Sequence, residues 1–190
     1  LYKLKNGLKL RLYTGEQNII ERQFYTTGSQ EFIEAFQNTF KLTRLTIPAS
    51  VTTLGANVFK GSGLTSITFD ASSAIANLTA STFEGATALS EIIFSGTSNY
   101  TTSDGALYTN DMTKLILYYS KDTSVTSFTV PATVTHIEDG AFQYSRHLTE
   151  IIFPTGSNAL TTIGSNAFRG LSLITNITIP TSVTSIGTDA

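Results

Sequence analysis

The sequence predicts a mainly β solenoid, a right-handed coil of parallel strands with short turns and 3-10 or helical segments on one side. Residues 42–59 read LTRLTIPASVTTLGANVF, residues 125–142 read VTSFTVPATVTHIEDGAF and residues 148–168 read LTEIIFPTGSNALTTIGSNAF. Residues 174–190 carry a further copy, ITNITIPTSVTSIGTDA. Self-similarity at a period of about 20–50 residues is typical of arrays in which each copy buries its apolar face against the next.

The spacing of landmark residues supports this prediction. Each copy begins with an aliphatic residue, at Leu42, Leu64, Leu89, Val125, Leu148 and Ile174. The steps between these positions are 22, 25, 36, 23 and 26 residues. We therefore expect six units, with an interruption inside the long step.

Each part of the unit has a physical role. In L-T-x-I-x-I-P, period-two alternation turns two aliphatic residues inward on a strand, as for Leu45 and Ile47, and the last copy predicts such a strand at Ile177 and Ile179. The proline ends the strand because it has no backbone donor. A second short extended piece, V-T-x-I-G, follows, and its glycine suits a turn that needs a permissive backbone. The phenylalanine that closes the unit is expected to fill the space between coils.

The joint spacing of Leu, Ile, Pro, Gly and Phe over residues 29–190 resembles that of the BspA-like leucine-rich repeats. The resemblance implies a leucine-rich-repeat solenoid. The cysteine that often follows the phenylalanine in that family is absent here, and Asp70 stands at the proline position of the second copy. Neither departure affects the predicted fold, because small or polar residues can fill a turn.

The long step contains a different pattern at residues 103–119. A turn at Asp104-Gly105 precedes a short strand at 106–108, and a polar turn near Asn110-Asp111 precedes a strand at 115–119. Polar turn residues between two apolar runs predict a strand–turn–strand excursion. Similar segments replace a standard unit in BspA-like arrays.

The two ends of the chain also depart from the repeat. Residues 1–28 predict a capping hairpin around Asn6-Gly7, because Asn-Gly between alternating apolar residues favours a tight turn. Residues 29–40 predict a short amphipathic helix whose inward face consists of Phe32, Ile33, Phe36 and Phe40. At the other end the array is expected to be truncated, which predicts apolar surface near Ile179, Val183 and Ile186 and possible end-to-end self-association.

Composition excludes several classes of function. Net charge is −2, and only 14% of residues are charged, so the chain offers no basic field for nucleic acid. No apolar run is long enough for a membrane span. The chain contains no cysteine, which excludes disulfides, thiolate metal sites and a cysteine nucleophile.

No catalytic, cofactor-binding or metal-binding residues are predicted. The two histidines, His136 and His147, are expected at an exposed strand position and in a turn, without the arrangement that general base catalysis requires. Asp104, Asp111 and Asp122 match no calcium-binding loop, and we interpret them as turn residues.

The candidate binding surface consists of outward strand positions and a group of tyrosines. Ile93 and Ile152 are aliphatic at a position where other copies carry threonine. These residues either form an apolar contact surface or are present because isoleucine favours the strand conformation. The charged members of the outward columns are Arg44, Glu91 and Glu150. Tyrosine is enriched at interfaces, and the candidate group is Tyr100, Tyr108, Tyr118 and Tyr119.

The resemblance to BspA-like proteins implies that this is a non-catalytic protein, either secreted or held at the cell surface, which mediates adhesion or protein binding. The expected partner is a protein ligand from host extracellular matrix or from a microbial surface. Two alternatives stay open at this point. The array could be a structural spacer that presents another domain of a longer protein, or a carbohydrate-binding module that uses the tyrosines.

Overall fold

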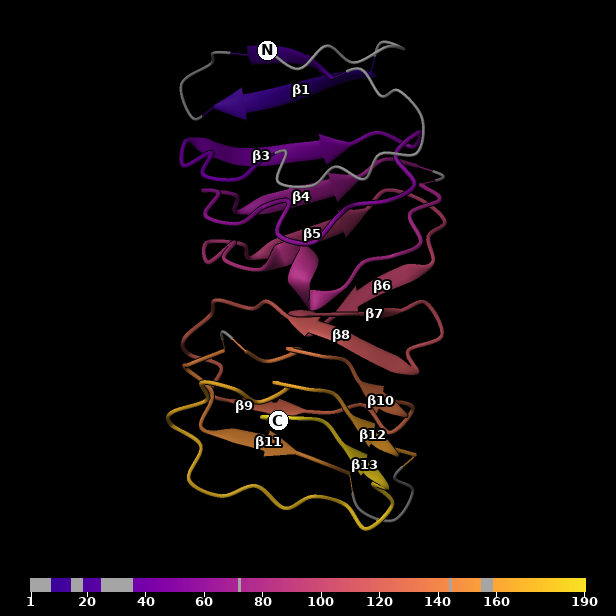
Figure 1. Ribbon diagram of the computed structural model, residues 1–190, viewed down its shortest axis with the longest axis vertical. Helices are drawn as coiled ribbons and strands as arrows, with labels where there is room; N and C mark the ends of the chain where they lie inside the picture. The colour runs from indigo at the N-terminus through magenta and orange to yellow at the C-terminus, as the bar shows by residue number, and fades with distance from the viewer. Residues whose placement is uncertain (1–7, 15–18, 25–35, 72, 144, 155–158) are drawn as a thin grey trace. The chain divides into compact units, whose positions relative to one another are not determined.

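The computed structural model describes the backbone of residues 8–14 and 19–24 and all atoms of residues 36–71, 73–143, 145–154 and 159–190. The chain divides into two compact units, Leu1–Asn99 and Tyr100–Ala190. Both are built from β-solenoid coils, and Figure 1 labels most of their strands. In the part of the chain that the structure describes, the one helical element is the 3-10 turn η1 (Ala80–Phe83).

The first unit is a five-stranded sheet in the order β2-β1-β3-β4-β5. Its parallel part comprises β3 (Leu42–Ile47), β4 (Ser66–Phe69) and β5 (Glu91–Phe94). The register pairs Leu45 with Ile67 and Ile67 with Ile92, as the repeat spacing predicts. These three side chains are at most 3% exposed, so the inward face is the core.

An antiparallel pair precedes these strands. It consists of β1 (Leu8–Thr14) and β2 (Ile19–Phe24), and β1 also pairs with the outer edge of β3. A strand beginning at Leu8 agrees with the sequence pattern, but its hairpin partner follows it in the chain. The predicted turn at Asn6-Gly7 lies outside the described residues, and the boundary of the cap at residue 28 stays a prediction.

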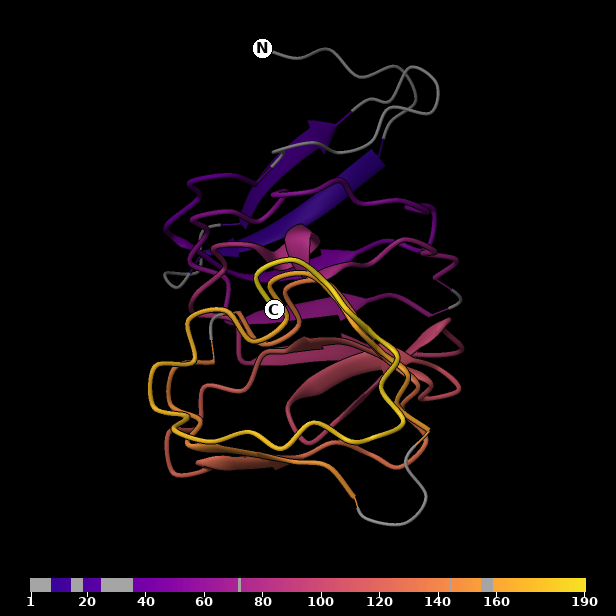
Figure 2. The ribbon, with the colours of Figure 1, turned by 60° about the horizontal axis from the view of Figure 1, so that its bottom comes forward.

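The second unit begins with an antiparallel meander and continues as two parallel ladders. The meander consists of β6 (Tyr100–Ser103), β7 (Ala106–Thr109) and β8 (Lys114–Tyr118). One ladder adds β10 (His136–Ile137), β12 (Thr162–Ile163) and β13 (Ser185–Ile186) to β8; the other pairs β9 (Ser127–Thr129) with β11 (Glu150–Ile152). Figure 2 shows the last coils of this unit as nested loops.

The interruption is part of the solenoid. Strands β7 and β8 confirm the predicted strand–turn–strand, with turns at 104–105 and 110–111, although the sequence pattern did not predict β6. Strand β10 joins β8 in parallel, with Ile137 opposite Leu115. The meander therefore provides the edge on which the following coils stack.

Aromatic rings fill the space between coils, as expected for the phenylalanine of the repeat. In the first unit the rings of Phe36, Phe59 and Phe83 stack with centroids 5.8 Å apart in each step. In the second unit Phe142 stacks on Tyr118 at 5.8 Å and on Phe168 at 5.7 Å. Tyr118 of the meander therefore occupies the place that a phenylalanine has in an ordinary coil.

The predicted helix at 29–40 is wrong in its described part, because residues 36–40 form turns. The Phe36 amide donates to Val58 C=O (3.0 Å) and the Asn38 amide to Lys60 C=O (2.9 Å), so these residues bond to the next coil instead of to their own turn. Phe36 is buried, but Phe40 is 73% exposed and not inward as predicted.

The last coil also differs from the expectation. Residues 173–180 form no strand, although the pattern predicts one at Ile177 and Ile179. Ile186 is 57% exposed, which confirms the predicted apolar surface at that position. Ile179 and Val183 are half-buried because they pack against the core beneath them, and end-to-end association stays a prediction.

The glycine of V-T-x-I-G has a different role from the one the sequence suggests. Neither Gly164 nor Gly187 has a left-handed φ. A Cβ on Gly164 would lie 2.5 Å from the Asp139 amide nitrogen, and one on Gly187 would clash with the Ser165 amide nitrogen. These glycines are required because neighbouring coils approach at the backbone.

No helix in the described ranges is long and apolar enough to cross a membrane.

Candidate functional site

The outward strand positions of the first unit form the columns that the repeat spacing predicts. Strand pairing places Arg44 beside Ser66 and Ser66 beside Glu91. The Ser66 hydroxyl donates to Glu91 Oε2 at 2.7 Å and is thereby shielded, whereas Arg44 and Glu91 are exposed. Ile93 lies beside Thr68 in the second column and is 38% exposed.

The second unit repeats this arrangement. Glu150 lies beside Ser127, and Ile152, also 38% exposed, lies beside Thr129. Both line a cavity of about 900 Å³ whose other wall includes Asn176 and Thr178 of the last coil. The structure therefore brings Glu150 and Ile152 to one open groove, which the sequence pattern did not predict.

The four tyrosines do not form a surface, and this part of the prediction is wrong. Tyr100, Tyr108, Tyr118 and Tyr119 are 7%, 0%, 3% and 8% exposed. The meander turns them into the core, where burial, with the nearby charge of Asp104, raises the pKa of Tyr108. These rings therefore present no exposed face on which a carbohydrate could stack.

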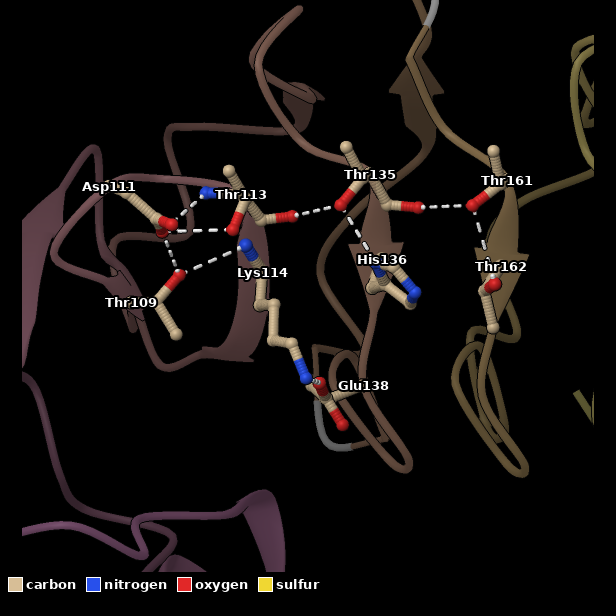
Figure 3. A network of polar contacts seen from close by, with 9 residues as sticks. All are labelled: Thr109, Asp111, Thr113, Lys114, Thr135, His136, Glu138, Thr161 and Thr162. Carbon is tan, nitrogen blue, oxygen red and sulfur yellow. Dashed lines mark hydrogen bonds and ion pairs between the residues drawn. The ribbon is translucent and has the colours of Figure 1, made fainter.

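A ladder of threonine hydroxyls runs across the coils (Figure 3). The Oγ1 of Thr135 donates to Thr113 C=O at 3.0 Å, and the Oγ1 of Thr161 donates to Thr135 C=O at 3.2 Å. The same contact joins Thr184 to Thr161 at 3.3 Å. The threonine of the V-T-x-I-G segment is therefore part of the ladder between coils, a role that its recurrence in the sequence could have indicated.

Charged groups surround the start of this ladder. Asp111 Oδ1 accepts bonds from the hydroxyls of Thr109 (2.6 Å) and Thr113 (2.8 Å), and these bonds lower the pKa of Asp111. Lys114 forms an ion pair with Glu138 at 3.2 Å. His136 is half-buried, not exposed as expected, and its Nδ1 lies 2.7 Å from Thr135 Oγ1.

The remaining acidic residues of the meander region support turns, as predicted. Asp122 Oδ1 accepts bonds from the Ser124 amide (3.0 Å) and hydroxyl (2.6 Å), and Asp104 accepts one from Ser103 (2.9 Å). Among residues 36–190, apart from the positions left undescribed, no cluster of three or more His, Asp or Glu side chains could hold a metal ion.

His147 lies in a turn, as predicted, and against the core. Its ring centroid is 5.9 Å from that of Tyr118, and its buried Nε2 has no hydrogen-bond partner among the described residues. Burial lowers the pKa of His147, and the charge of Lys121 lowers it further.

We expect the second unit to lose stability in mild acid through this residue. Because the folded state favours the neutral ring, the stabilisation is complete above the ordinary histidine pKa of 6.5 and declines as the pH falls through the lowered value. Urea unfolding between about pH 7.5 and 5 measures this decline. His147→Gln should remove most of it, and His136→Gln should not. An equal slope in His147→Gln would contradict the assignment.

The stacked parallel strands, the aromatic column and the threonine ladder define a β-solenoid repeat protein. The chain belongs to the BspA type leucine rich repeat family, whose model matches residues 17–120 and 113–190 with six copies. This confirms the family that the sequence motif resembles.

Solved structures agree with this assignment. A leucine-rich repeat protein from Eubacterium ventriosum ATCC 27560 is 29% identical over 81% of this chain, with a TM-score of 0.69. The pneumococcal vaccine antigen PcpA shares the fold at 22% identity over 86% of this chain, with a TM-score of 0.50. This chain spans 40% of each of those two chains. No curated protein matches it.

Proposed function

We propose that this chain is the protein-binding part of a non-catalytic adhesion protein that is secreted or held at the cell surface. The observation that carries the proposal is the pair of outward columns on parallel strands, in which Ile93 and Ile152 are exposed at the same phase of the repeat. The location and the adhesive role rest on membership of the BspA-type family.

The chemistry of these columns fits protein contacts. Each exposed isoleucine has a threonine beside it in the neighbouring coil, Thr68 or Thr129, and an outward carboxylate two residues earlier, Glu91 or Glu150. An apolar centre with a polar rim is the usual anatomy of a protein interface. Repeat solenoids present such surfaces in extended form.

The double variant Ile93→Thr/Ile152→Thr is expected to weaken binding to a protein partner at least tenfold. Threonine is the residue that other copies carry in this column, so strand propensity is kept while the apolar contact is reduced. Biolayer interferometry against a panel of matrix proteins and microbial surface proteins gives the partner and its Kd.

The matched control is Val125→Thr, which changes a 43% exposed β-branched residue outside the columns and should leave the Kd unchanged. Absence of binding to every member of the panel would count against the adhesion role. If cells that display the double variant attach as well as cells that display the parent protein, the spacer function is favoured instead.

A further inference from the structure

Two neighbouring coils of the second unit are joined along one ladder and separated along the other. Strands β12 and β13 are paired, with the Thr184 amide donating to Thr161 C=O at 2.9 Å and the Gly187 amide to Ile163 C=O at 2.8 Å. In contrast, among the described residues no backbone hydrogen bond joins 149–153 to 175–180. The cavity of about 900 Å³ lies at this separation.

The corresponding bond joins neighbouring coils at this phase of the repeat in both units. The Thr65 amide donates to Thr43 C=O at 2.8 Å, and the Thr149 amide donates to Thr126 C=O at 2.7 Å. The equivalent bond from Thr175 to Thr149 is missing. The separation is therefore a local feature of β11, since the same two coils are paired at β12 and β13.

The sequence offers a cause for this separation. In the ordinary copies the strand-ending proline is six residues before the aliphatic of the second strand, as from Pro131 to Ile137 and from Pro180 to Ile186. From Pro154 to Ile163 the spacing is nine. The three additional residues lie between Pro154 and Ile163, so this coil contains more residues at this point than the coil that should pair with it.

The separation leaves one edge of β11 without a paired strand among the described residues. The Glu150 amide donates to Thr126 C=O (3.3 Å) and Ile152 C=O accepts from Val130 (2.9 Å), so residues 150 and 152 bond toward β9. Backbone groups of alternate residues point to opposite edges of a strand, which directs the N–H and C=O of Ile151 toward the groove. Neither group has a partner among the described residues.

We propose that an extended peptide segment of a partner protein binds in this groove by adding a strand to the open edge of β11. This inference rests on the proposed protein-binding function and names its mode. The main chain of an extended peptide supplies both a donor and an acceptor for Ile151. A volume of about 900 Å³ is within the usual range of ligand sites.

The groove lining indicates which peptide fits. Among the described residues that line the groove, Glu150 is the one with a charged side chain, and hydroxyls line much of the remainder. The exposed Ile152 and the half-buried Pro180 provide apolar contact on either side. The matching segment is rich in threonine and valine, which favour extended backbone, and carries one lysine or arginine opposite Glu150.

The test uses the full chain and a fluorescein-labelled heptapeptide, acetyl-TVTKVTV-amide. Fluorescence polarisation should show saturable binding, and hydrogen exchange by NMR should show the Ile151 amide slowed at least tenfold by the peptide. The same peptide N-methylated at alternate residues loses its donors on one edge and should bind at least tenfold more weakly.

Charge reversal locates the binding site. Glu150→Lys should weaken the lysine peptide at least fivefold and improve a peptide with glutamate in place of lysine. The control Asp70→Lys reverses an exposed carboxylate of the first unit that lies outside the outward columns, and it should leave both affinities unchanged.

Three results would overturn the proposal. The first is absence of saturable binding, or binding that N-methylation does not affect. The second is an Ile151 amide in the free protein as protected as that of Ile163, which means that the chain's own residues 175–179 fill the edge. The third is a dimer in sedimentation that Glu150→Lys dissociates, which means that a second copy fills it. If whole proteins still bind the outward columns in any of these cases, the proposed function stands and only strand addition fails.

Discussion

Phe142→Ala is expected to destabilise the second unit by about 3–5 kcal/mol, a large share of the roughly 5–15 kcal/mol by which native proteins are stable. Phe142 is completely buried, and its ring lies between Tyr118 and Phe168 with edge contact to Phe128 at 5.4 Å. Alanine would leave a cavity between coils that rigid strands cannot close. Urea unfolding, followed by circular dichroism, measures the change.

Two variants make this expectation specific. Phe142→Leu keeps most of the apolar volume and should cost less than half as much. Phe168→Ala removes a half-buried ring from the next coil and should also cost less, since part of that ring already contacts water. Equal losses in all three variants would show that the aromatic column does not determine the stability of this unit.

Gly164→Ala is expected to destabilise the same unit by roughly 3 kcal/mol, a large effect for the addition of one methyl group. The new Cβ would lie 2.5 Å from the Asp139 amide nitrogen and 2.7 Å from the Glu138 carbonyl carbon. Both are backbone atoms, so relief requires the coils to separate. That movement would weaken the bond from the Gly164 amide to Ile137 C=O, now 2.8 Å.

Ser165→Ala is the appropriate control, because it alters the adjacent side chain while the close approach at residue 164 is kept. It should change the free energy of unfolding by less than about 0.5 kcal/mol. A Gly164→Ala protein as stable as the parent would mean that the coils can separate without cost. The crystal structure of that variant would then show a longer distance between residues 164 and 139.

The sequence predicted the repeat phase because its signals are local. Alternation within each strand and the steps between leading aliphatics determine that Leu45, Ile67 and Ile92 share the inward face, and the structure confirms this register. The outward positions Glu91, Ile93, Glu150 and Ile152 follow from the same pattern. Their exposure was therefore predictable, but the groove beside β11 was not.

The remaining errors concern contacts between coils. Whether the Tyr108 side chain faces water or the core depends on which residues cover the meander. Whether Phe40 is exposed depends on how residues 36–38 bond to the next coil. The need for glycine at 164 comes from a backbone in another coil. None of these contacts between coils can be predicted from a short window of sequence.

The threonine ladder has a consequence for how such an array changes over evolutionary time. Each hydroxyl, such as that of Thr135 or Thr161, donates to a main-chain carbonyl of the preceding coil, and every residue has such a carbonyl. When duplication or recombination adds or removes one unit, two coils become new neighbours. Their threonine hydroxyls still find main-chain acceptors, because every preceding coil provides them. The outward residues of the copied unit can then diverge, while the internal hydrogen bonds are inherited unchanged.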